Sequence, residues 1–322
     1  MTQVFRIGLL GASKIARTAI MAPLKDDARF VVTAVAARDP ERARAYADEH
    51  AIASVAESYE ALIGRDDVDV IYNGLPPAGH AEWSIAALEA GKAVLCEKPF
   101  ARNAREAEAM VDAAHATGRQ LLEAFHYRFH TVMRRAEALV RQGALGALHT
   151  GRAEFNVAIA KKPGELRWSR ELGGGAMMDL GCYPLHAMRT LTGAEPEIAS
   201  AHAQFDDGGA DASMGAELVF PGGVSVSITC SMIAPFNIAL RLDGARGRLE
   251  ITNFVAPHRG SRFTTTIDGE TIEQPTDGPT TYAAQLGHLY EVLTGAAAPL
   301  TGGSDAIATM TAIDAIYGAA RR

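Results

Sequence analysis

Short apolar runs alternate with alanine-rich stretches through residues 1–125, and this alternation limits the fold more than any other feature of the sequence. It is typical of βαβ units, in which helices cover both faces of a parallel sheet. The run Val4–Leu10 is almost continuously apolar, as expected for a strand buried on both faces. Later strands are predicted at Phe30–Ala36, Val68–Tyr72, Ala93–Cys96 and Gln120–Ala124. Helices are predicted after the first turn as far as Met21, from Pro40 with Asp39 as N-cap, over His80–Ala90 before Gly91, and over Asn103–Ala116 before Gly118.

The pattern changes after residue 125. Helices are predicted over Thr131–Arg141 and from the glycine run Gly173–Gly175 to Leu191, with a long strand over Leu148–Ala158 between them. Alternating segments between residues 198 and 267 predict antiparallel strands at Ala216–Phe220, Val224–Ser231, Ile238–Leu242 and Gly247–Thr252. The predicted fold class is therefore α/β, with an N-terminal Rossmann domain over residues 1–124. An α+β domain with an open, mainly antiparallel sheet is expected over residues 125–300, and a helix within residues 301–322 (Ser304–Ala320) is expected to pack back on the first domain.

The composition excludes several classes of protein. With 48% hydrophobic and 21% charged residues among 322, the chain has the balance of an ordinary globular protein. The net charge of −7 provides no electrostatic attraction to nucleic acid or to anionic lipid. No apolar run reaches the ~18 residues of a membrane span, and a strand beginning at Val4 leaves no room for a secretion leader. Cys96, Cys182 and Cys230 fit neither a disulfide framework nor a zinc site, so we expect a cytoplasmic protein without a metal.

A glycine turn joins the first predicted strand to the first helix. In GLLGASKIA, residues 8–16, the positions of a GxGxxG dinucleotide-binding pattern fall on Gly11, Ser13 and Ala16, so small residues replace two of the glycines. Small residues let the backbone approach a pyrophosphate, which the N–H groups of the following helix then bind. The candidate phosphate-binding residues are Gly11, Ala12, Ser13, Lys14 and Ile15. A strand-to-helix turn that binds no ligand would have the same pattern, and this alternative stays open.

The end of the second predicted strand bears on the choice of cofactor. A site that prefers NAD usually carries an acidic residue there, which binds the ribose 2′-hydroxyl. Here that position is Ala37, and the guanidinium of Arg38, the next residue, suits a 2′-phosphate. Asp39 is better explained as the N-cap of the helix that Pro40 begins. The segment therefore favours NADP, with NAD as the alternative if the register is off by one or two residues.

Glu97-Lys98-Pro99 follows the predicted strand Ala93–Cys96, at the sheet edge where doubly wound folds bind their ligands. From that edge Lys98 could reach both a nicotinamide ribose and a substrate hydroxyl. A lone Glu-Lys pair is more often a surface ion pair, but here other segments accompany it. They read GLLGASKIA, AARDPERA, YNGLPPAGHAEW, ALEAGKAVLCEKPF and GGGAMMDLGCYPLH. Together they resemble the Gfo/Idh/MocA family, the relatives of glucose–fructose oxidoreductase and inositol dehydrogenase, over residues 4–130 and 165–192.

The resemblance implies roles for individual residues. Lys98 matches the lysine of the family's EKP motif, which contacts cofactor and substrate, with Glu97 beside it. Asp179 and Tyr183 match the D-x-G-x-Y pattern of the branch that contains glucose–fructose oxidoreductase, xylose dehydrogenases and dimeric dihydrodiol dehydrogenases. The inositol dehydrogenase-like branch has histidine in place of Tyr183 and aspartate in place of His186. Arg167-Trp168 resembles a segment that lines the nicotinamide pocket, and the family implies a homodimer or homotetramer formed through the C-terminal sheet.

Oxidation of an alcohol requires a hydride acceptor and a base. The nicotinamide takes the hydride, and the protein supplies orientation and proton transfer. Tyr183 is the candidate acid/base; because a free phenol has a pKa of roughly 10, a nearby ammonium such as Lys98 would have to favour the phenolate. Asp179 would bind a neighbouring substrate hydroxyl or orient Lys98. The spacing of Asp179, Tyr183 and His186 places them on one helical face, which Pro184 is expected to bend.

Five other candidates have packing alternatives of equal weight. Leu75, Pro76 and His80 are expected beside the nicotinamide or at the start of the next helix, while Arg128 and His130 are candidate substrate contacts. His186 is a further candidate substrate contact, but a histidine with a structural role in the core or at the surface is the favoured alternative there. The predicted function is hydride transfer between NADP, or NAD, and a CH–OH or C=O group of a sugar, polyol or related diol. Two alternatives remain: an enzyme that uses transient oxidation for non-redox sugar chemistry, and a non-catalytic dinucleotide-binding sensor or assembly subunit.

Overall fold

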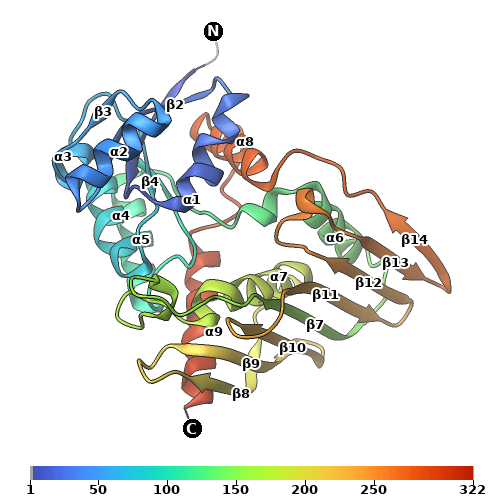
Figure 1. The fold of residues 1–322 in the computed structure, drawn as a ribbon. Coiled ribbons are helices and arrows are strands. Elements are labelled where there is room, and N and C mark those ends of the chain that lie inside the picture. The colour runs from blue at the N-terminus through green and yellow to red at the C-terminus, as the bar shows by residue number, and fades with distance from the viewer. Residues whose placement is uncertain (1–2, 322) are drawn as a thin grey trace. The chain divides into compact units, whose positions relative to one another are not determined.

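The computed structural model describes residues 3–321, which cluster into two compact units. The first unit consists of residues 3–125 together with Tyr282–Ile307, and the second of His126–Thr281 together with residues 308–321. Each unit is built around one sheet (Figure 1). Among residues 3–321, no helix has both the length and the apolarity that crossing a bilayer requires.

The sheet of the first unit is parallel throughout and has six strands in the order β3-β2-β1-β4-β5-β6. The strands are β1 (Phe5–Leu10), β2 (Phe30–Ala36), β3 (Ser54–Val55), β4 (Val70–Asn73), β5 (Ala93–Cys96) and β6 (Leu121–Glu123). This order confirms the predicted Rossmann domain. The strand order reverses between β1 and β4, and ligands of such sheets bind where the carboxyl ends of those two strands diverge.

Helices connect these strands, and their ends follow the predicted caps. They are α1 (Lys14–Ala16), α2 (Pro40–His50), α3 (Tyr59–Ile63), α4 (His80–Glu89) and α5 (Ala104–Thr117). The Asp39 carboxylate accepts hydrogen bonds from the backbone N–H groups of Glu41 and Arg42, which confirms it as the N-cap of α2. Gly118 ends α5 with a φ of 65°, in the left-handed region that favours glycine. The first helix differs from its prediction, because α1 continues as a π-helix over Arg17–Met21, and β3 and α3 have no counterpart in the prediction.

A helix from the far end of the sequence completes the core of the first unit. Helix α8 (Thr281–Leu293) was not predicted, and its buried residues Leu286, Leu289 and Val292 pack with the apolar residues of β1 and β2. The Tyr290 ring lies 5.9 Å from that of Phe5 and meets it edge to face. Residues 282–307 therefore cluster with the first unit, whereas the sequence analysis places residues 125–300 in the second domain.

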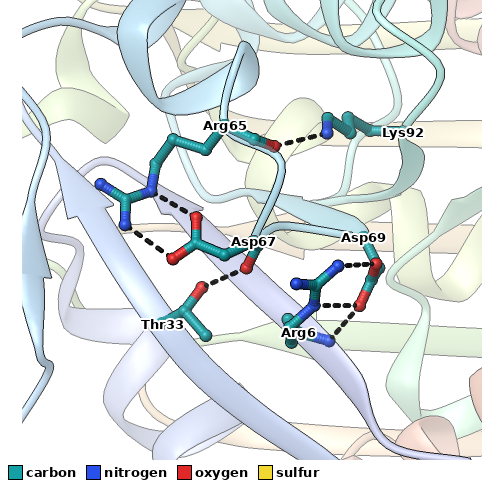
Figure 2. Close-up of polar contacts among 6 residues, drawn as sticks. All are labelled: Arg6, Thr33, Arg65, Asp67, Asp69 and Lys92. Atoms are coloured by element: carbon teal, nitrogen blue, oxygen red, sulfur yellow. Dashed lines mark hydrogen bonds and ion pairs between the residues drawn. The ribbon is translucent and has the colours of Figure 1, made fainter.

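Ion pairs and hydrogen bonds close the amino-terminal edge of the same sheet (Figure 2). Arg6, in β1, donates to the Asp69 carboxylate from its backbone N–H at 2.8 Å and from its guanidinium at 2.7 and 2.9 Å. Just ahead of Asp69, the Arg65 guanidinium holds the Asp67 carboxylate, and Lys92 donates to the Arg65 carbonyl oxygen at 2.6 Å. These contacts lie at the edge opposite the carboxyl ends of the strands. In the first unit, the ion pairs and the candidate functional residues are therefore at different edges of the sheet.

The second unit contains an eight-stranded open sheet in the order β14-β13-β12-β11-β7-β10-β9-β8. Its strands are β7 (Leu148–Asn156), β8 (Glu197–Phe205), β9 (Asp211–Phe220), β10 (Val224–Ser231), β11 (Asn237–Gly244), β12 (Gly247–Thr252), β13 (Phe263–Ile267) and β14 (Glu270–Gln274). All neighbours are antiparallel except β7 and β10, which are parallel. The prediction of an open, mainly antiparallel sheet is confirmed.

The two faces of this sheet differ in chemistry. One face is apolar and buried, and helix α7 (Cys182–Thr192) packs on its strands β7 and β10, with α6 (Thr131–Arg141) against α7. The other face carries alternating charges: Arg241 lies opposite Glu250 on one side and Arg152 on the other. Its ion pairs include Arg241 with Asp243 at 2.7 Å. Since this face is polar, water can cover it in a single chain.

The C-terminal helix α9 spans Ser304–Ala320, as predicted. Within the second unit, Arg189 of α7 donates to the Thr309 hydroxyl, and the Tyr317 hydroxyl donates to Asp211 at 2.6 Å. Residues 308–321 accordingly cluster with the second unit, whereas the sequence analysis places residues 301–322 against the first domain. The difference arises because long-range side-chain partners, absent from any local pattern, hold the helix.

Candidate functional site

The predicted phosphate-binding turn lies at the carboxyl end of β1. Gly11 has a φ of 85°, and its backbone N–H donates to the Ala36 carbonyl oxygen at 2.8 Å. The turn requires glycine because of this positive φ, and a Cβ at Gly11 would lie 3.0 Å from the end of the Leu75 side chain, a tight contact. The Ser13 hydroxyl caps α1 by accepting from the Ala16 N–H at 3.3 Å. The earlier N–H groups of a first helical turn have no carbonyl partner in their own helix, which makes this turn fit a phosphate.

Two arginines stand at the carboxyl end of β2. Ala37 and Arg38 directly follow the strand, and Arg38 is exposed. Arg42, one turn into α2, donates from its guanidinium to the Ala12 carbonyl oxygen at 2.8 Å, which ties it to the phosphate-binding turn. Burial raises the pKa of Tyr59, while the backbone of Arg38 and the charges of both arginines act in the opposite direction. Arg42 is not among the cofactor-binding residues predicted from the sequence. Its position four residues after Arg38, at the start of a helix, was a signal that could have identified it.

Lys98 is held at the carboxyl end of β5 by its neighbour. The fully buried Tyr72 hydroxyl, in β4, donates to the Glu97 carboxylate at 2.7 Å, and that carboxylate also accepts from the Lys98 N–H at 3.3 Å. Burial, followed by the Glu97 charge, raises the pKa of Tyr72 well above its usual value, which keeps the hydroxyl a donor. The Lys98–Pro99 peptide bond is cis. Glu97 thus anchors the turn that carries the lysine.

The side chain of His80 contacts both the loop after β4 and the loop after β5. Its Nδ1 lies 2.9 Å from the Pro99 carbonyl oxygen and its Nε2 lies 2.8 Å from that of Leu75. The ring is fully buried, and burial lowers the pKa of His80. His80 is also the first residue of α4, which was one of its two predicted placements. With both ring nitrogens against main-chain carbonyls, it positions Leu75 and Pro76 relative to Lys98 and Pro99.

In the second unit, the glycine run makes room for two neighbouring segments. A Cβ at Gly174 would lie 2.6 Å from the carbonyl oxygens of Leu166 and Arg167, and a Cβ at Gly175 would collide with the Asp211 carboxylate. The Gly175 N–H donates to the Arg167 carbonyl oxygen at 2.8 Å. These glycines therefore let the turn Leu166–Trp168 and the Asp211 side chain pack against the start of the next helix.

That next helix begins as a π-helix over Met177–Gly181 and continues as α7 from Cys182. The predicted helix is confirmed, but its first turn is wider than an α-helical turn. Pro184 lies three residues after the end of this π-turn. The irregularity lies before the proline, in the π-turn that contains Asp179.

The three candidate side chains of this helix have separate partners. Asp179 accepts from the Arg167 guanidinium at 2.7 Å, and this carboxylate is the main cause of a raised pKa of Arg167. The Tyr183 hydroxyl lies 3.1 Å from His126 Nε2. His186 Nδ1 lies 2.5 Å from the Tyr127 hydroxyl. The π-turn changes the helical phase between Asp179 and the other two residues, whereas Tyr183 and His186 both contact the ring of Tyr127.

The remaining candidates have structural partners of their own. Arg128 is buried and donates two hydrogen bonds to the Glu137 carboxylate, at 2.8 and 2.9 Å. His130 is the N-cap of α6, where its Nδ1 accepts from the Val132 N–H at 3.2 Å. Burial is the largest cause of a lowered pKa of His130. Contact with a substrate stays a prediction for both residues.

Asp211 holds the start of the π-helix. Its carboxylate accepts from the Met177 N–H at 2.7 Å and from the Tyr317 hydroxyl at 2.6 Å, and burial raises the pKa of Asp211 to about 6. A rise from the unfolded value of about 4 corresponds to roughly 3 kcal/mol. Because the folded state binds the proton more tightly, this contribution to stability is present below about pH 4 and is lost as the pH rises through about 6.

We therefore expect Asp211→Asn, whose amide keeps one hydrogen-bond acceptor and gains a donor, to remove this pH-dependent loss of stability. From pH 4 to pH 7, the free energy of unfolding of the wild type should fall by roughly 3 kcal/mol relative to the variant. Urea unfolding of both proteins at pH 4, 5, 6 and 7 measures the difference, in which all other titrating groups cancel. A difference that does not change with pH would contradict the assignment.

Comparisons with known proteins identify the family and the fold. Residues 5–125 match the family model of an oxidoreductase family with an NAD-binding Rossmann fold, and residues 133–250 match that of the GFO/IDH/MocA C-terminal domain. A D-xylose 1-dehydrogenase (NADP(+)) of Haloferax volcanii is 31% identical over 312 residues, which cover 96% of this chain and 95% of the relative. Among solved structures, an aldose-aldose oxidoreductase from Caulobacter crescentus complexed with glycerol has a TM-score of 0.91 and 30% identity, covering 99% of this chain and 98% of that one. A 3-ketoreductase from Actinomadura kijaniata in complex with NADP and TDP-benzene has a TM-score of 0.90 and 26% identity, covering 98% of each chain.

Proposed function

We propose, from the premise that the chain belongs to the Gfo/Idh/MocA family of NAD(P)-binding oxidoreductases, that it transfers a hydride between NADP and a CH–OH or C=O group of a sugar, polyol or related diol. The observation that carries the proposal is how two candidate proton-transfer residues are held, one through its backbone and the other through its hydroxyl. Glu97 and Tyr72 hold the segment of Lys98, and His126 holds the hydroxyl of Tyr183. A non-catalytic dinucleotide sensor has no need of either.

The choice of NADP rests on the end of β2. Asp39 caps helix α2, and Ala37, where a site that prefers NAD usually has an acidic residue, carries no carboxylate. Arg38 and Arg42 bring two guanidinium groups to the same end of the strand, and such groups suit the 2′-phosphate. The NADP named in the Haloferax relative and bound in the Actinomadura structure supports the same choice.

The division of labour follows from the side chains. When bound, the nicotinamide supplies or accepts the hydride. Tyr183 exchanges the proton of the substrate hydroxyl, and the ammonium of Lys98 favours the phenolate form of that tyrosine during the step. Asp179 holds Arg167 through its ion pair, and its carboxylate is the proposed acceptor for a substrate hydroxyl. Arg167 and Trp168 line the nicotinamide side.

We also propose that the chain assembles as a homodimer or homotetramer through the charged face of the second sheet. Arg152, Arg241 and Glu250 lie side by side across three strands there, an arrangement that a two-fold axis can make self-complementary. Sedimentation at 0.1 and 1 M salt tests this, because a monomer at both concentrations, or a dimer indifferent to charge reversal of Arg241, would contradict it.

A panel of aldoses, polyols and aromatic trans-diols, assayed with NADP and NAD by absorbance, tests the proposed function. We expect turnover of at least one class, with kcat/KM higher for NADP than for NAD. Arg38→Ser should lower kcat/KM for NADP by roughly 10- to 100-fold, the effect of losing a charged hydrogen bond, and leave NAD within about threefold. Arg44→Ser, at an exposed position of helix α2, which follows Arg38, is the matched control. Tight NADP binding without any turnover would favour the sensor, and turnover without net change in NADPH would favour transient oxidation.

A further inference from the structure

Three segments of the second unit bring a phenol, an imidazole and a hydroxyl into one hydrogen-bonded line. His126 begins the 3-10 turn His126–Phe129, Tyr183 lies in the first turn of α7, and Thr281 is the first residue of α8. The Tyr183 hydroxyl is 3.1 Å from His126 Nε2, and His126 Nδ1 is 2.9 Å from the Thr281 hydroxyl. Both nitrogens of the imidazole therefore have a side-chain oxygen as partner.

Burial makes these contacts specific. His126 is 5% exposed, Tyr183 4% and Thr281 0%, so bulk water does not readily replace any of the three partners. The rings of His126 and Tyr183 meet edge to face with centroids 5.8 Å apart, and Phe155 covers the phenol from another side at 5.6 Å. Thr281 is fixed in turn, because its N–H donates to His258 Nδ1 at 3.3 Å. A buried hydrogen-bonded chain of this kind holds its members in one geometry.

A neutral imidazole has one N–H and one lone pair, so its partners decide which nitrogen carries the proton. If His126 Nδ1–H donates to the Thr281 hydroxyl, the lone pair of Nε2 faces the Tyr183 hydroxyl. The phenol is then the donor and the imidazole the acceptor. This is the arrangement in which a base activates a hydroxyl while a third group orients the base.

We propose that His126 and Thr281 are positioning residues for Tyr183, and that the three side chains act as a phenol–imidazole–hydroxyl triad; this rests on the proposed role of Tyr183 as acid/base. In alcohol oxidation the phenol proton passes to His126 Nε2, and the phenolate oxygen takes the proton of the substrate hydroxyl as the C–H hydride leaves. The imidazolium afterwards releases its extra proton to solvent. In carbonyl reduction the same transfers run in reverse. No proton is gained or lost beyond the one that the substrate exchanges.

A second phenol–imidazole pair in the same unit provides a matched control. The Tyr127 hydroxyl contacts His186 Nδ1 at 2.5 Å, and Tyr127 is completely buried. It shares the chemistry and the packing of the first pair, since its ring also meets that of Tyr183 edge to face. Tyr127→Phe therefore removes one buried hydroxyl beside the triad without breaking the line from Tyr183 to Thr281.

The tautomer of His126 is measurable without a substrate. In a nitrogen-15 correlation spectrum of the full-length protein with labelled histidine, we expect the His126 signals, identified by their loss in His126→Gln, to report a protonated Nδ1 and an unprotonated Nε2. Thr281→Val removes the acceptor of the Nδ1 proton at constant shape and should shift the population toward protonated Nε2. Thr281→Ser keeps the hydroxyl and should retain the wild-type tautomer. A protonated Nε2 in the wild type would overturn the proposal.

Kinetics then test the triad in turnover, with NADP and the best substrate of the panel. His126→Gln retains a hydrogen-bond acceptor near the phenol but has no group that takes up a proton, so we expect kcat to fall at least 10-fold with KM within about threefold. Thr281→Val should lower kcat by roughly 10-fold and Thr281→Ser by less than about threefold. In the His126→Gln background Thr281→Val should have no further effect, because it acts through His126.

The outcomes separate this proposal from the proposed function. Turnover by the wild type that His126→Gln and Thr281→Val leave unchanged overturns the triad and leaves the function in place. A loss of kcat in Tyr127→Phe equal to that in Thr281→Val also overturns it, because the effect would then be one of packing. If no substrate is turned over while the expected tautomer is found, the proposed function fails and the hydrogen-bonded geometry stands.

Discussion

Replacing Tyr183 with phenylalanine is expected to lower kcat by 10²–10⁴-fold, the usual effect of removing a general acid/base. The substitution removes one oxygen and keeps the ring, whose contacts with Tyr127 and Phe155 fill the surrounding space. The fold and NADP affinity should therefore be preserved, and the loss should appear in kcat and in kcat/KM alike. Steady-state kinetics and NADP binding followed by fluorescence measure the two quantities.

A matched control removes a tyrosine hydroxyl elsewhere. Tyr290→Phe, in the core of the first unit, should leave kcat within about threefold, since its ring contacts with Phe5 and Phe30 do not use the oxygen. Lys98→Met combined with Tyr183→Phe should cost little more than the more harmful single change, because groups that serve one step are not additive. Turnover of Tyr183→Phe within about threefold of the wild type would contradict the role assigned to the phenol.

Removal of the Glu137 carboxylate is expected to destabilise the protein by roughly 3–5 kcal/mol, because it leaves a buried guanidinium without a partner. Arg128 is 6% exposed, and Glu137 is the acceptor of both its described hydrogen bonds. Glu137→Leu should therefore shift the urea unfolding midpoint far more than a surface change. The reverse variant, Arg128→Leu, should cost less, because Glu137 keeps its ion pair with Arg141 at 2.6 Å.

Two further variants decide whether charge burial is the cause. Arg128→Met combined with Glu137→Leu removes both charges and should recover most of the lost stability, since an apolar pair of similar volume replaces a desolvated ion pair well. Arg141→Ala should change the free energy of unfolding by less than about 1 kcal/mol, because its side chain is 77% exposed. A double variant as unstable as Glu137→Leu alone would show that packing, not the unpaired charge, is responsible.

Local sequence signals predicted the elements whose ends depend on neighbouring residues. The bounds of β2, β5, β10, β12, α6 and α9 agree with the predictions to the residue. Asp39 caps α2 and Gly118 ends α5 for reasons contained within one helical turn. The βαβ alternation predicted a parallel sheet, whereas the strand order β3-β2-β1-β4-β5-β6 came from the structure. Lys98 could be placed at the carboxyl end of β5 because the strand immediately precedes it.

Tertiary structure decided the features that depend on distant partners. Helix α8 has an ordinary amphipathic pattern, and only its contacts with Phe5 and Phe30 assign it to the first unit. The hydrogen bond between Tyr183 and His126 joins residues that are 57 positions apart in the sequence. Nothing near either residue indicates the other.

The sequence by itself therefore determined the fold class and the glycine turn after β1, and it supplied the candidates for the chemically active side chains. Only the folded chain decided that Asp211 anchors the π-turn, that Glu137 neutralises Arg128, and which oxygen faces each histidine nitrogen. The physical reason is the distance along the chain over which each interaction is determined. Backbone propensities and caps are set within a few residues, whereas the energy of a buried polar group depends on which partner the rest of the chain brings to it.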